Sequence, residues 1–438
     1  MPKRSSRTAR VALEETLQDR GSPSHPTATG RMLVVMERGQ VKSARKSLEN
    51  TAGLSVAASS DFAAGASGSN QADVLLETLG IAVVTPDPNQ GASLMSAAAD
   101  EGNPSILAVE PELICYALGS VPVDLEYLRG WRDATAYLYD RLSQGQAAAQ
   151  EAGVQDESQF TWGLQACGID TTAFNGLGIR VAVLDTGFDL QHPDFVGRTV
   201  ESKSFITGQT VDDGHGHGTH CIGTACGPQR PTDERPRYGI AYGASIFAGK
   251  VLSNGGAGPD GGILEGIEWA VVNGCSVVSM SLGAQGPVSI AYETAGQRAL
   301  DAGTLVIAAA GNESTRPGFI APVGRPANSV SVLAIAALDE PLNIAGFSNG
   351  GTLDDGGQID LAGPGVRIFS AAPHQTGLVR KSGTSMATPH VAGLAALYAQ
   401  AFPASRGLAL KALLLQNAKR LPLPSTDVGS GLVQAPQP

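Results

Sequence analysis

Short, almost uninterrupted runs of Val, Ile, Leu and Ala recur through the second part of the chain and constrain its fold more than any other feature. The runs IRVAVLD, SIFAGKVL, CSVVSMSL, TLVIAAA and VSVLAIAAL alternate with helical stretches such as GGILEGIEWAVVNG and SIAYETAGQRALDAG. A strand that is apolar on both sides is buried on both faces, which is typical of a parallel sheet between two layers of helices. The sequence therefore predicts an α/β fold with a doubly wound, mostly parallel sheet.

Polar residues stand where these runs end. Asp185 closes IRVAVLD and Ser281 lies near the end of CSVVSMS. Asn312 follows TLVIAAAG, and Ser385 opens the long helical run SMATPHVAGLAALYAQAF. Taken singly, Asp185 and Ser385 are also suited to helix caps, and Asn312 to a turn. Because chemistry in such sheets gathers at the carboxyl ends of the strands, we expect these four groups to converge on one rim.

The segment GHGHGTHC holds three of the seven histidines, His215, His217 and His220, and suggests either a metal site or a proton carrier. An H-x-H-x-x-H cluster at a strand–helix junction spreads its rings over different faces, and no neighbouring Cys or carboxylate completes a convincing zinc set. Nucleophilic acyl transfer instead needs a nucleophile, a base and an acid that orients the base. Asp185, His217 and Ser385 supply these groups in one of the chain orders known for such triads.

Together, the motifs VAVLDTGFDLQHPDF, GHGHGTHCIG, SMSLG, AAAGNES and GTSMATPHVAGLAAL resemble the subtilisin-like serine proteases, the subtilases, from Trp162 to the C-terminus. The resemblance implies a serine endopeptidase whose chemistry needs no cofactor. In it, Ser385 is the nucleophile, His217 the general base and Asp185 the acid that orients the base. Asn312 is the side-chain donor to the oxyanion, assisted by backbone N–H groups at the start of the Ser385 helix.

The resemblance also implies two extended edges that pair with the substrate main chain and a first specificity pocket beside them. The residues concerned are Ser281, Leu282, Gly283, Gly256, Ala257, Gly258, Ala309, Gly311 and Glu313. Main-chain pairing suits protein and peptide substrates without selecting one sequence. Asp260 stands where many relatives carry an aromatic residue near a more distant pocket. With Glu313 it leads to the hypothesis that basic or polar substrate side chains are favoured.

A small α+β unit precedes the α/β part. Residues 31–117 read as β-α-β-β-α-β, a ferredoxin-like pattern in which LSVAASSDF and VLLETLGIAVVTPD are each expected to be a strand. They resemble the propeptide that subtilases use as a folding aid and inhibitor; an unrelated ferredoxin-like module is the alternative. The resemblance implies a zymogen with the tail of this domain in the substrate cleft. Residues 1–30 are expected to be a flexible arm, 118–160 a helical and polar linker where autoprocessing occurs, and 161–438 the catalytic domain.

A calcium site is less clearly indicated. Asp194 in QHPDF matches a calcium ligand of the family, but GPQRPTDERPRYGIA replaces the loop that normally supplies most of the other oxygens. Because calcium takes six to eight oxygen ligands, we do not predict this particular site. Calcium as a structural ion elsewhere stays open.

The cysteines are odd in number and irregularly spaced, which favours free thiols over a disulfide framework. They are Cys115, Cys167, Cys221, Cys226 and Cys275. Cys221 adjoins the histidine motif, so we expect it to pack beneath the triad and to make the enzyme sensitive to thiol reagents.

Composition excludes several classes of function. The formal net charge is −11, whereas a nucleic-acid partner would require clustered Lys and Arg. We find no apolar run of the roughly 18 residues that a membrane helix needs, and no apolar core of a secretory signal near the start. We expect a monomer that is cytoplasmic or exported without a cleavable leader. The rival interpretation is a regulatory or binding protein on a subtilase scaffold, held inactive by its front domain.

Overall fold

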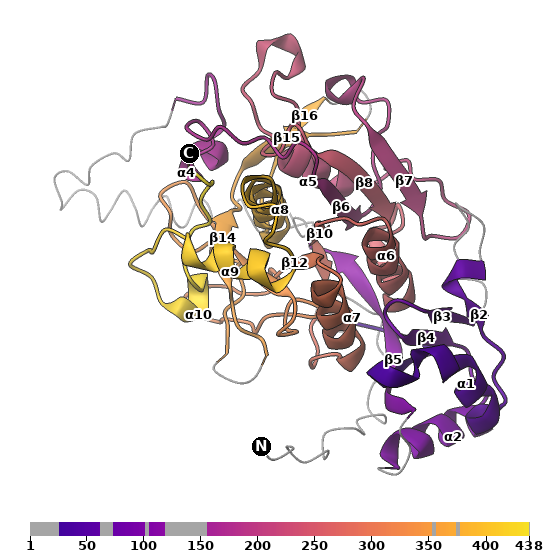
Figure 1. Ribbon diagram of the computed structural model, residues 1–438. Helices are drawn as coiled ribbons and strands as arrows, with labels where there is room; N and C mark the ends of the chain where they lie inside the picture. Colours follow the sequence, from indigo (N-terminus) through magenta and orange to yellow (C-terminus); the bar gives the residue numbers. More distant parts are fainter. Residues whose placement is uncertain are drawn as a thin grey trace.

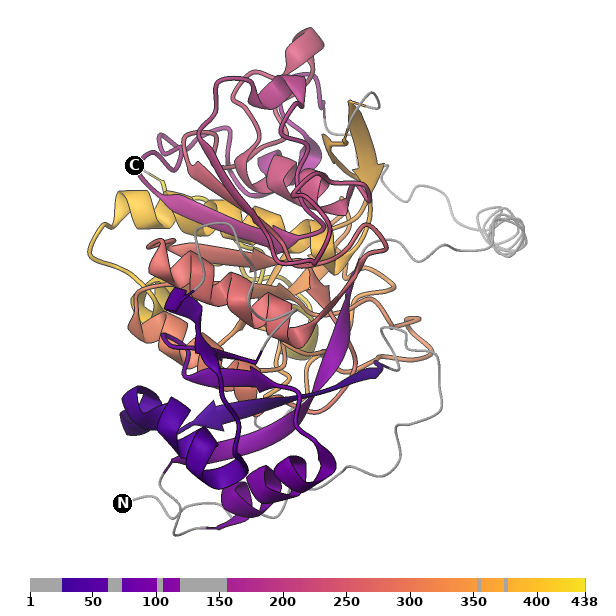
Figure 2. The same cartoon turned by 90° about the vertical axis from the view of Figure 1, so that its right-hand side faces the viewer.

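The structure is a computed structural model that describes residues 26–61, 73–100, 105–118, 156–352, 356–373 and 377–437. A small front unit lies against one side of a larger α/β unit, and strand β5 runs from the first into the second (Figure 1, Figure 2). Most of the predicted arm and most of the predicted linker fall outside the described residues.

The larger unit is built on a parallel sheet of the predicted kind. All its neighbouring strands are parallel, in the order β14-β13-β12-β10-β6-β8-β7. In that order the strands are Leu361–Pro364, Leu333–Leu338, Leu305–Ala309, Val277–Met280, Arg180–Asp185, Ser245–Lys250 and Val200–Ser204. Most of their residues are buried, as the continuous apolar runs predict, although the edge strand β7 is partly exposed.

Helices cover both faces of this sheet, which confirms the doubly wound arrangement. Helices α6 (Asp260–Val272) and α7 (Ile290–Asp301) cover one face, while α5 (His217–Cys226) and the long α8 (Thr384–Ala401) cover the other (Figure 1). The shorter helices are α4 (Trp162–Ala166), α9 (Leu408–Gln416), α10 (Ser425–Val428), η3 (Pro193–Phe195) and η4 (Thr232–Glu234). Strands β15 (Ile368–Ala371) and β16 (Leu378–Lys381) form a separate hairpin.

The front unit is the predicted α+β domain, with its main strands in the order β5-β1-β4-β3-β2. Its elements are β1 (Ala28–Met36), η1 (Arg38–Ser43), α1 (Ala44–Ala52), β2 (Ala57–Ala58), η2 (Ser59–Asp61), β3 (Val74–Leu76), β4 (Ile81–Val84), α2 (Pro88–Ala99) and β5 (Ile106–Ala117). The second helix starts at a capping box formed by Asp87 and Gln90.

Three details of the front unit differ from the sequence prediction. The first strand begins at Ala28, not at Arg31. The run VLLETLGIAVVTPD, predicted as one strand, is the antiparallel pair β3 and β4. Gly80 lies in the turn between them with φ of +57°, a left-handed conformation that suits glycine and lets the chain reverse. The predicted strand LSVAASSDF is reduced to Ala57–Ala58.

The two units share an apolar core. One face of the front sheet, including Leu33, Val35 and Ile81, belongs to the same buried cluster as the core of the larger unit. The other face packs with α1 and α2 in a smaller cluster that includes Val34 and Leu48. The front unit is therefore docked by a buried sheet face, not tethered by its chain alone.

Strand β5 is the element that carries the front unit into the functional region. Its last residues lie between β9 (Ala257–Pro259) and β11 (Leu282–Gly283) and run antiparallel to both. Among the described residues, no helix combines the length and apolar character needed to cross a membrane.

Candidate active site

The predicted triad residues meet at the carboxyl end of the sheet. Asp185 is the last residue of β6, His217 the first of α5, and Ser385 the second of α8. His217 Nδ1 lies 2.7 Å from Asp185 Oδ1, and each side chain is 1% exposed. A buried carboxylate at this nitrogen fixes the imidazole tautomer and leaves Nε2 free to take a proton.

The serine hydroxyl is engaged by the front unit. Ser385 Oγ lies 2.6 Å from the carbonyl oxygen of Leu118 and 3.0 Å from that of Ser281. His217 Nε2 has no hydrogen-bond partner among the described residues. Because a hydroxyl carries a single proton, Ser385 donates to one of these two carbonyls at a time instead of to the imidazole.

Asn312 completes the surroundings of the Leu118 carbonyl. Its Nδ2 donates to that oxygen at 2.5 Å. Its Oδ1 accepts from Thr384 N and Thr384 Oγ1, both at 2.9 Å, which fixes the orientation of the amide. A Cβ at Gly383 would lie 2.9 Å from the Leu118 oxygen, so only glycine leaves room for the carbonyl. This is the geometry of a donor aimed at an oxyanion.

Asp213, which the sequence analysis missed, organises the loop that presents His217. Its buried carboxylate accepts from Thr186 Oγ1 and from the backbone N–H groups of His215 and Gly216. It also accepts from Thr219 N and Thr219 Oγ1, each at 2.8 Å. Burial alone would raise the pKa of Asp213, but these hydrogen bonds outweigh it and lower the pKa. An Asp just before a glycine-rich helix start was the available signal in the sequence.

The other two histidines of the cluster do not join His217 in a shared site. His220 is buried, its Nε2 lies 3.0 Å from the Ile368 carbonyl, and burial lowers its pKa to about 3. His215 is exposed, with its ring centroid 6.2 Å from that of His217. Among the described residues, the group that brings three metal-ligating side chains together is Asp185, His217 and Cys221, not the three histidines. The geometry thus favours the proton carrier.

The predicted substrate edges hold β5. Leu118 N donates to Ser281 O at 3.2 Å and Ala117 N to Gly256 O at 2.8 Å. Tyr116 is paired with Ala257 on one side and Gly283 on the other. The described tail of the front unit therefore lies in the cleft as an added antiparallel strand, the arrangement expected for a bound peptide.

The residues predicted to line the first specificity pocket lie near the Leu118 side chain or near one another. A Cβ at Gly283 would lie 3.2 Å from Leu118 Cδ1, so Gly283 packs closely against that side chain. Glu313 accepts from Asn349 Nδ2 at 2.6 Å and from Gln285 Nε2 at 3.0 Å. Gly311, with φ of +114°, passes close to this pair, and Ala309 is buried at the end of β12. The Glu313 carboxylate is thus already hydrogen-bonded by amides.

Asp194 does not fit the calcium site suggested by the resemblance. One carboxylate oxygen accepts from Thr232 N and the other from Tyr238 Oη, both at 2.7 Å. Burial and the adjacent carboxylate raise the pKa of Tyr238, so the phenol keeps the proton that it donates. Both oxygens are occupied by protein donors, and the donor set is wrong for a hard cation.

All five cysteines are buried and free, as predicted. Cys221 Sγ lies 3.8 Å from His217 Nδ1 and 3.6 Å from the carbonyl oxygen of Ser385, directly beside the triad. Burial, reinforced by Asp185, raises its thiol pKa well above the usual value. The thiol is therefore protonated at neutral pH.

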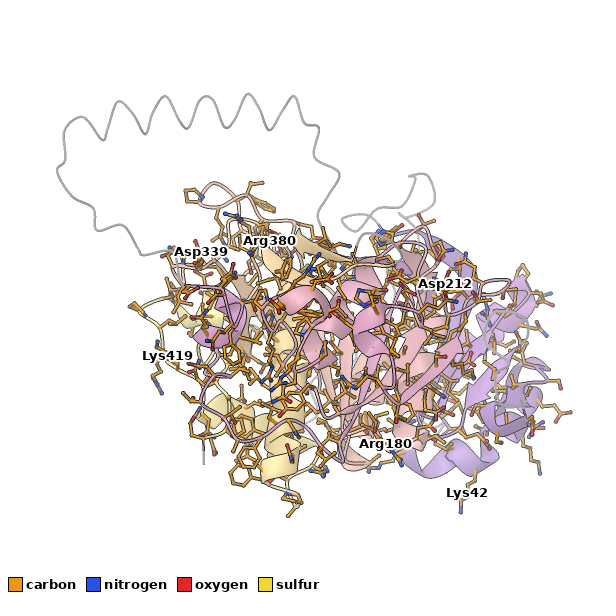
Figure 3. All side chains as sticks on the ribbon, turned by 90° about the horizontal axis from the view of Figure 1, so that it is seen from above. Lys42, Arg180, Asp212, Asp339, Arg380 and Lys419 are labelled. Atoms are coloured by element: carbon orange, nitrogen blue, oxygen red, sulfur yellow. The ribbon has the colours of Figure 1, made fainter. Side chains whose placement is uncertain are left out.

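The charged residues labelled in Figure 3 do not gather into a second site. Lys42, Asp212, Asp339, Arg380 and Lys419 lie spread over the outside of the molecule, with both signs represented (Figure 3).

An Asp–His pair beside a serine, an amide donor and a cleft for an extended chain define a serine hydrolase site built for peptides. Comparison with known proteins agrees: residues 176–432 match the Subtilase family. Over 242 residues the chain is 38% identical to Subtilisin DY of Bacillus licheniformis, covering 55% of this chain and 83% of that protein. Over 279 residues it is 38% identical to Subtilisin Savinase of Lederbergia lenta, covering 63% and 96%. The chain belongs to the subtilase family and is a subtilisin-like serine endopeptidase.

Proposed function

We propose that the protein is made as a self-inhibited zymogen that cleaves its own chain after Leu118. One observation carries this proposal: the Leu118 carbonyl oxygen lies 2.6 Å from Ser385 Oγ and 2.5 Å from Asn312 Nδ2. A scissile carbonyl must contact both the nucleophile and the oxyanion donor, and in this chain the front unit supplies such a carbonyl.

The chemistry follows from these positions. Ser385 Oγ attacks the carbonyl carbon of Leu118 while His217 Nε2 takes the hydroxyl proton, and Asp185 stabilises the imidazolium. The negative oxygen accepts from Asn312 Nδ2 and from backbone N–H at the start of α8. His217 then protonates the leaving amine, which breaks the peptide bond and leaves an ester between Leu118 and Ser385. Water, deprotonated by His217, hydrolyses that ester.

The cleaved front unit would remain bound as an inhibitor. Glu110 accepts from the first N–H groups of α7, Ile290 N at 3.0 Å and Ala291 N at 3.1 Å. Glu112 accepts from Gly261 N at 2.9 Å at the start of α6. Carboxylates at helix N-termini are favourable, and together with the shared apolar core they hold β5 in the cleft.

Once the front unit leaves, the same two edges would accept a strand from a protein substrate. The rival interpretation, a binding or regulatory protein on this scaffold, gives no reason for a buried Asp185–His217 pair beside a serine and an oriented Asn312.

The test compares the wild type with Ser385→Ala, and uses Ser43→Ala, at an exposed serine of the front unit, as matched control. Intact mass and release of peptides from casein are followed with time. We expect the wild type and Ser43→Ala to process and then digest casein, and Ser385→Ala to do neither. Processing of Ser385→Ala, or an unprocessed wild type that never digests casein, would contradict the proposal.

A further inference from the structure

A buried polar cluster surrounds the fourth residue before the proposed cleavage point. That residue, Cys115 of β5, contacts Asp260 at the start of α6 and Tyr292 of α7, and Arg325, from the loop between β12 and β13, is bound to the same Asp260. Exposed fractions are 0% for Cys115 and Asp260, 1% for Tyr292 and 4% for Arg325. From the resemblance, Asp260 replaces an aromatic residue near a more distant pocket, and with Glu313 it led to the hypothesis that basic or polar substrate side chains are favoured.

Hydrogen bonds connect the cluster to the bound strand. Asp260 Oδ1 accepts from Tyr292 Oη at 2.9 Å and from Cys115 Sγ at 3.3 Å. Asp260 Oδ2 accepts from Arg325 Nη2 and from the backbone N–H of Leu113, both at 2.8 Å. The bound strand thus gives this carboxylate one side-chain donor and one main-chain donor.

The cluster is nearly neutral overall, because the Asp260 carboxylate and the Arg325 guanidinium form a buried ion pair. Burial alone would lower the pKa of Arg325, but its charged and polar neighbours, Asp260 first among them, outweigh burial and raise the pKa, so the guanidinium stays charged. Burial raises the pKa of the Cys115 thiol well above its usual value, and the thiol keeps its proton as a donor. A basic side chain would find Asp260 already neutralised. Of the basic or polar side chains that the earlier hypothesis favoured, this argues against the basic ones at this position.

A large apolar side chain suits this place poorly. It would take away the donor that Cys115 provides and press hydrocarbon against a charge pair that is excluded from water. Cys115 is fully buried, and its strand partner Gly258 is itself closely packed, since a Cβ there would overlap the Val251 carbonyl oxygen. Close-packed surroundings make insertion of extra atoms unfavourable.

We infer that Asp260, Tyr292 and Arg325 form a specificity pocket that selects a small hydrogen-bond donor, Ser or Cys, four residues before the cleaved bond. The inference rests on the proposed function, because the position is counted from Leu118. Main-chain pairing in the cleft does not select a sequence, whereas this pocket would. The preferred substrates would be segments with a small hydroxyl or thiol side chain at this position and Leu at the cleaved bond.

The experiment uses the processed enzyme and peptides ELI-X-YALG with a quenched fluorophore pair, in which X is Ser, Ala, Leu or Phe. A shorter peptide, YALG, lacks the tested position. We expect kcat/KM to be highest for Ser, about 2- to 10-fold lower for Ala, and at least about 10-fold lower for Leu and Phe. The factor for Ala corresponds to the usual free-energy contribution of one buried hydrogen bond.

A second arm removes only one hydroxyl of the pocket. In Tyr292→Phe, the ratio of kcat/KM between the Ser and Ala peptides should fall toward one, and Tyr398→Phe, at a tyrosine of α8, serves as control with the wild-type ratio. Because the ratio is taken within one enzyme preparation, the amount of folded protein cancels.

The outcomes separate the two proposals. If YALG is cleaved after Leu but the Leu or Phe peptide equals the Ser peptide, the pocket inference is overturned and the protease proposal stands. If YALG and every longer peptide are left uncut, the proposed function fails, and the pocket inference with it.

Discussion

Asp213 offers a quantitative test, because its carboxylate organises the loop that carries His217. The proposed change is Asp213→Asn, which keeps the shape of the side chain. The amide oxygen can still accept from Thr186 Oγ1, His215 N and Gly216 N, which all bind one carboxylate oxygen in the structure. The new NH₂ group then faces the donors that bound the other oxygen.

The loss of stability in Asp213→Asn follows from the hydrogen bonds of the second carboxylate oxygen. It accepts from Thr219 N and Thr219 Oγ1, each at 2.8 Å. The hydroxyl can rotate and accept from the new amide, but the buried backbone N–H of Thr219 cannot, so it loses a hydrogen bond to a charged group. Such a loss lowers the free energy of unfolding by about 2 to 3 kcal/mol.

The pH dependence has a definite sign. The folded-state pKa of Asp213 is lowered from its ordinary value of 3.8. The unfolded state therefore binds more protons between the two pKa values, and stability rises with pH there. The contribution is complete above about pH 4 and is lost as the pH falls through the folded-state pKa. The stability difference between wild type and Asp213→Asn should shrink in acid.

The assay is the urea midpoint at pH 7 and pH 3, measured in the Ser385→Ala background so that autolysis does not interfere. Asp212→Asn, the same chemical change at the exposed neighbouring residue, is the control. A midpoint for Asp213→Asn equal to that of the control at pH 7 would refute the reasoning.

Four further perturbations address other parts of the site. Asn312→Ala should lower kcat by about 10²- to 10³-fold, a magnitude taken from the matching asparagine of a subtilisin, and an unchanged kcat would remove Asn312 from the oxyanion site. Cys115→Ser should process at the wild-type rate and Cys115→Leu about 10-fold more slowly, as followed by intact mass; equal rates would contradict the polar pocket. Calcium should change the thermal midpoint of wild type and Asp194→Asn by the same increment, whereas a loss of that increment in the variant would place an ion at Asp194. A thiol reagent that labels Cys221 should abolish peptidase activity because the sulfur lies beside His217, and full activity after labelling would contradict that.

The parallel sheet predicted from the sequence is confirmed, and the triad stays a prediction in which Asp185 and His217 lie 2.7 Å apart. Both the sheet and the triad leave local signals in the sequence. Strands buried on both faces must be apolar throughout, so an Asp or Ser at the end of such a run marks the functional rim. Asp185 was found in this way, and Ser385 was found at the start of the long helical run SMATPHVAGLAALYAQAF. The family motifs supplied the roles of His217 and Asn312.

The features that the sequence did not predict depend on distant parts of the chain meeting in space. Arg325 and Tyr292 have no local pattern that pairs them with Asp260, because the three come from a loop and two different helices. The position of Leu118 likewise depends on the register of β5 between two short edge strands. The sequence limited the proposed cleavage site only to residues 118–160. The register of β5 instead points to Leu118, the first residue of that range.

The most direct test of the central claim is the mass of the front fragment released when the wild-type chain first processes. We expect a fragment that ends at Leu118 and a remaining chain that begins at residue 119. A first cut elsewhere in 118–160 would show that the Leu118 carbonyl is held in the oxyanion site without being the bond that the enzyme cleaves.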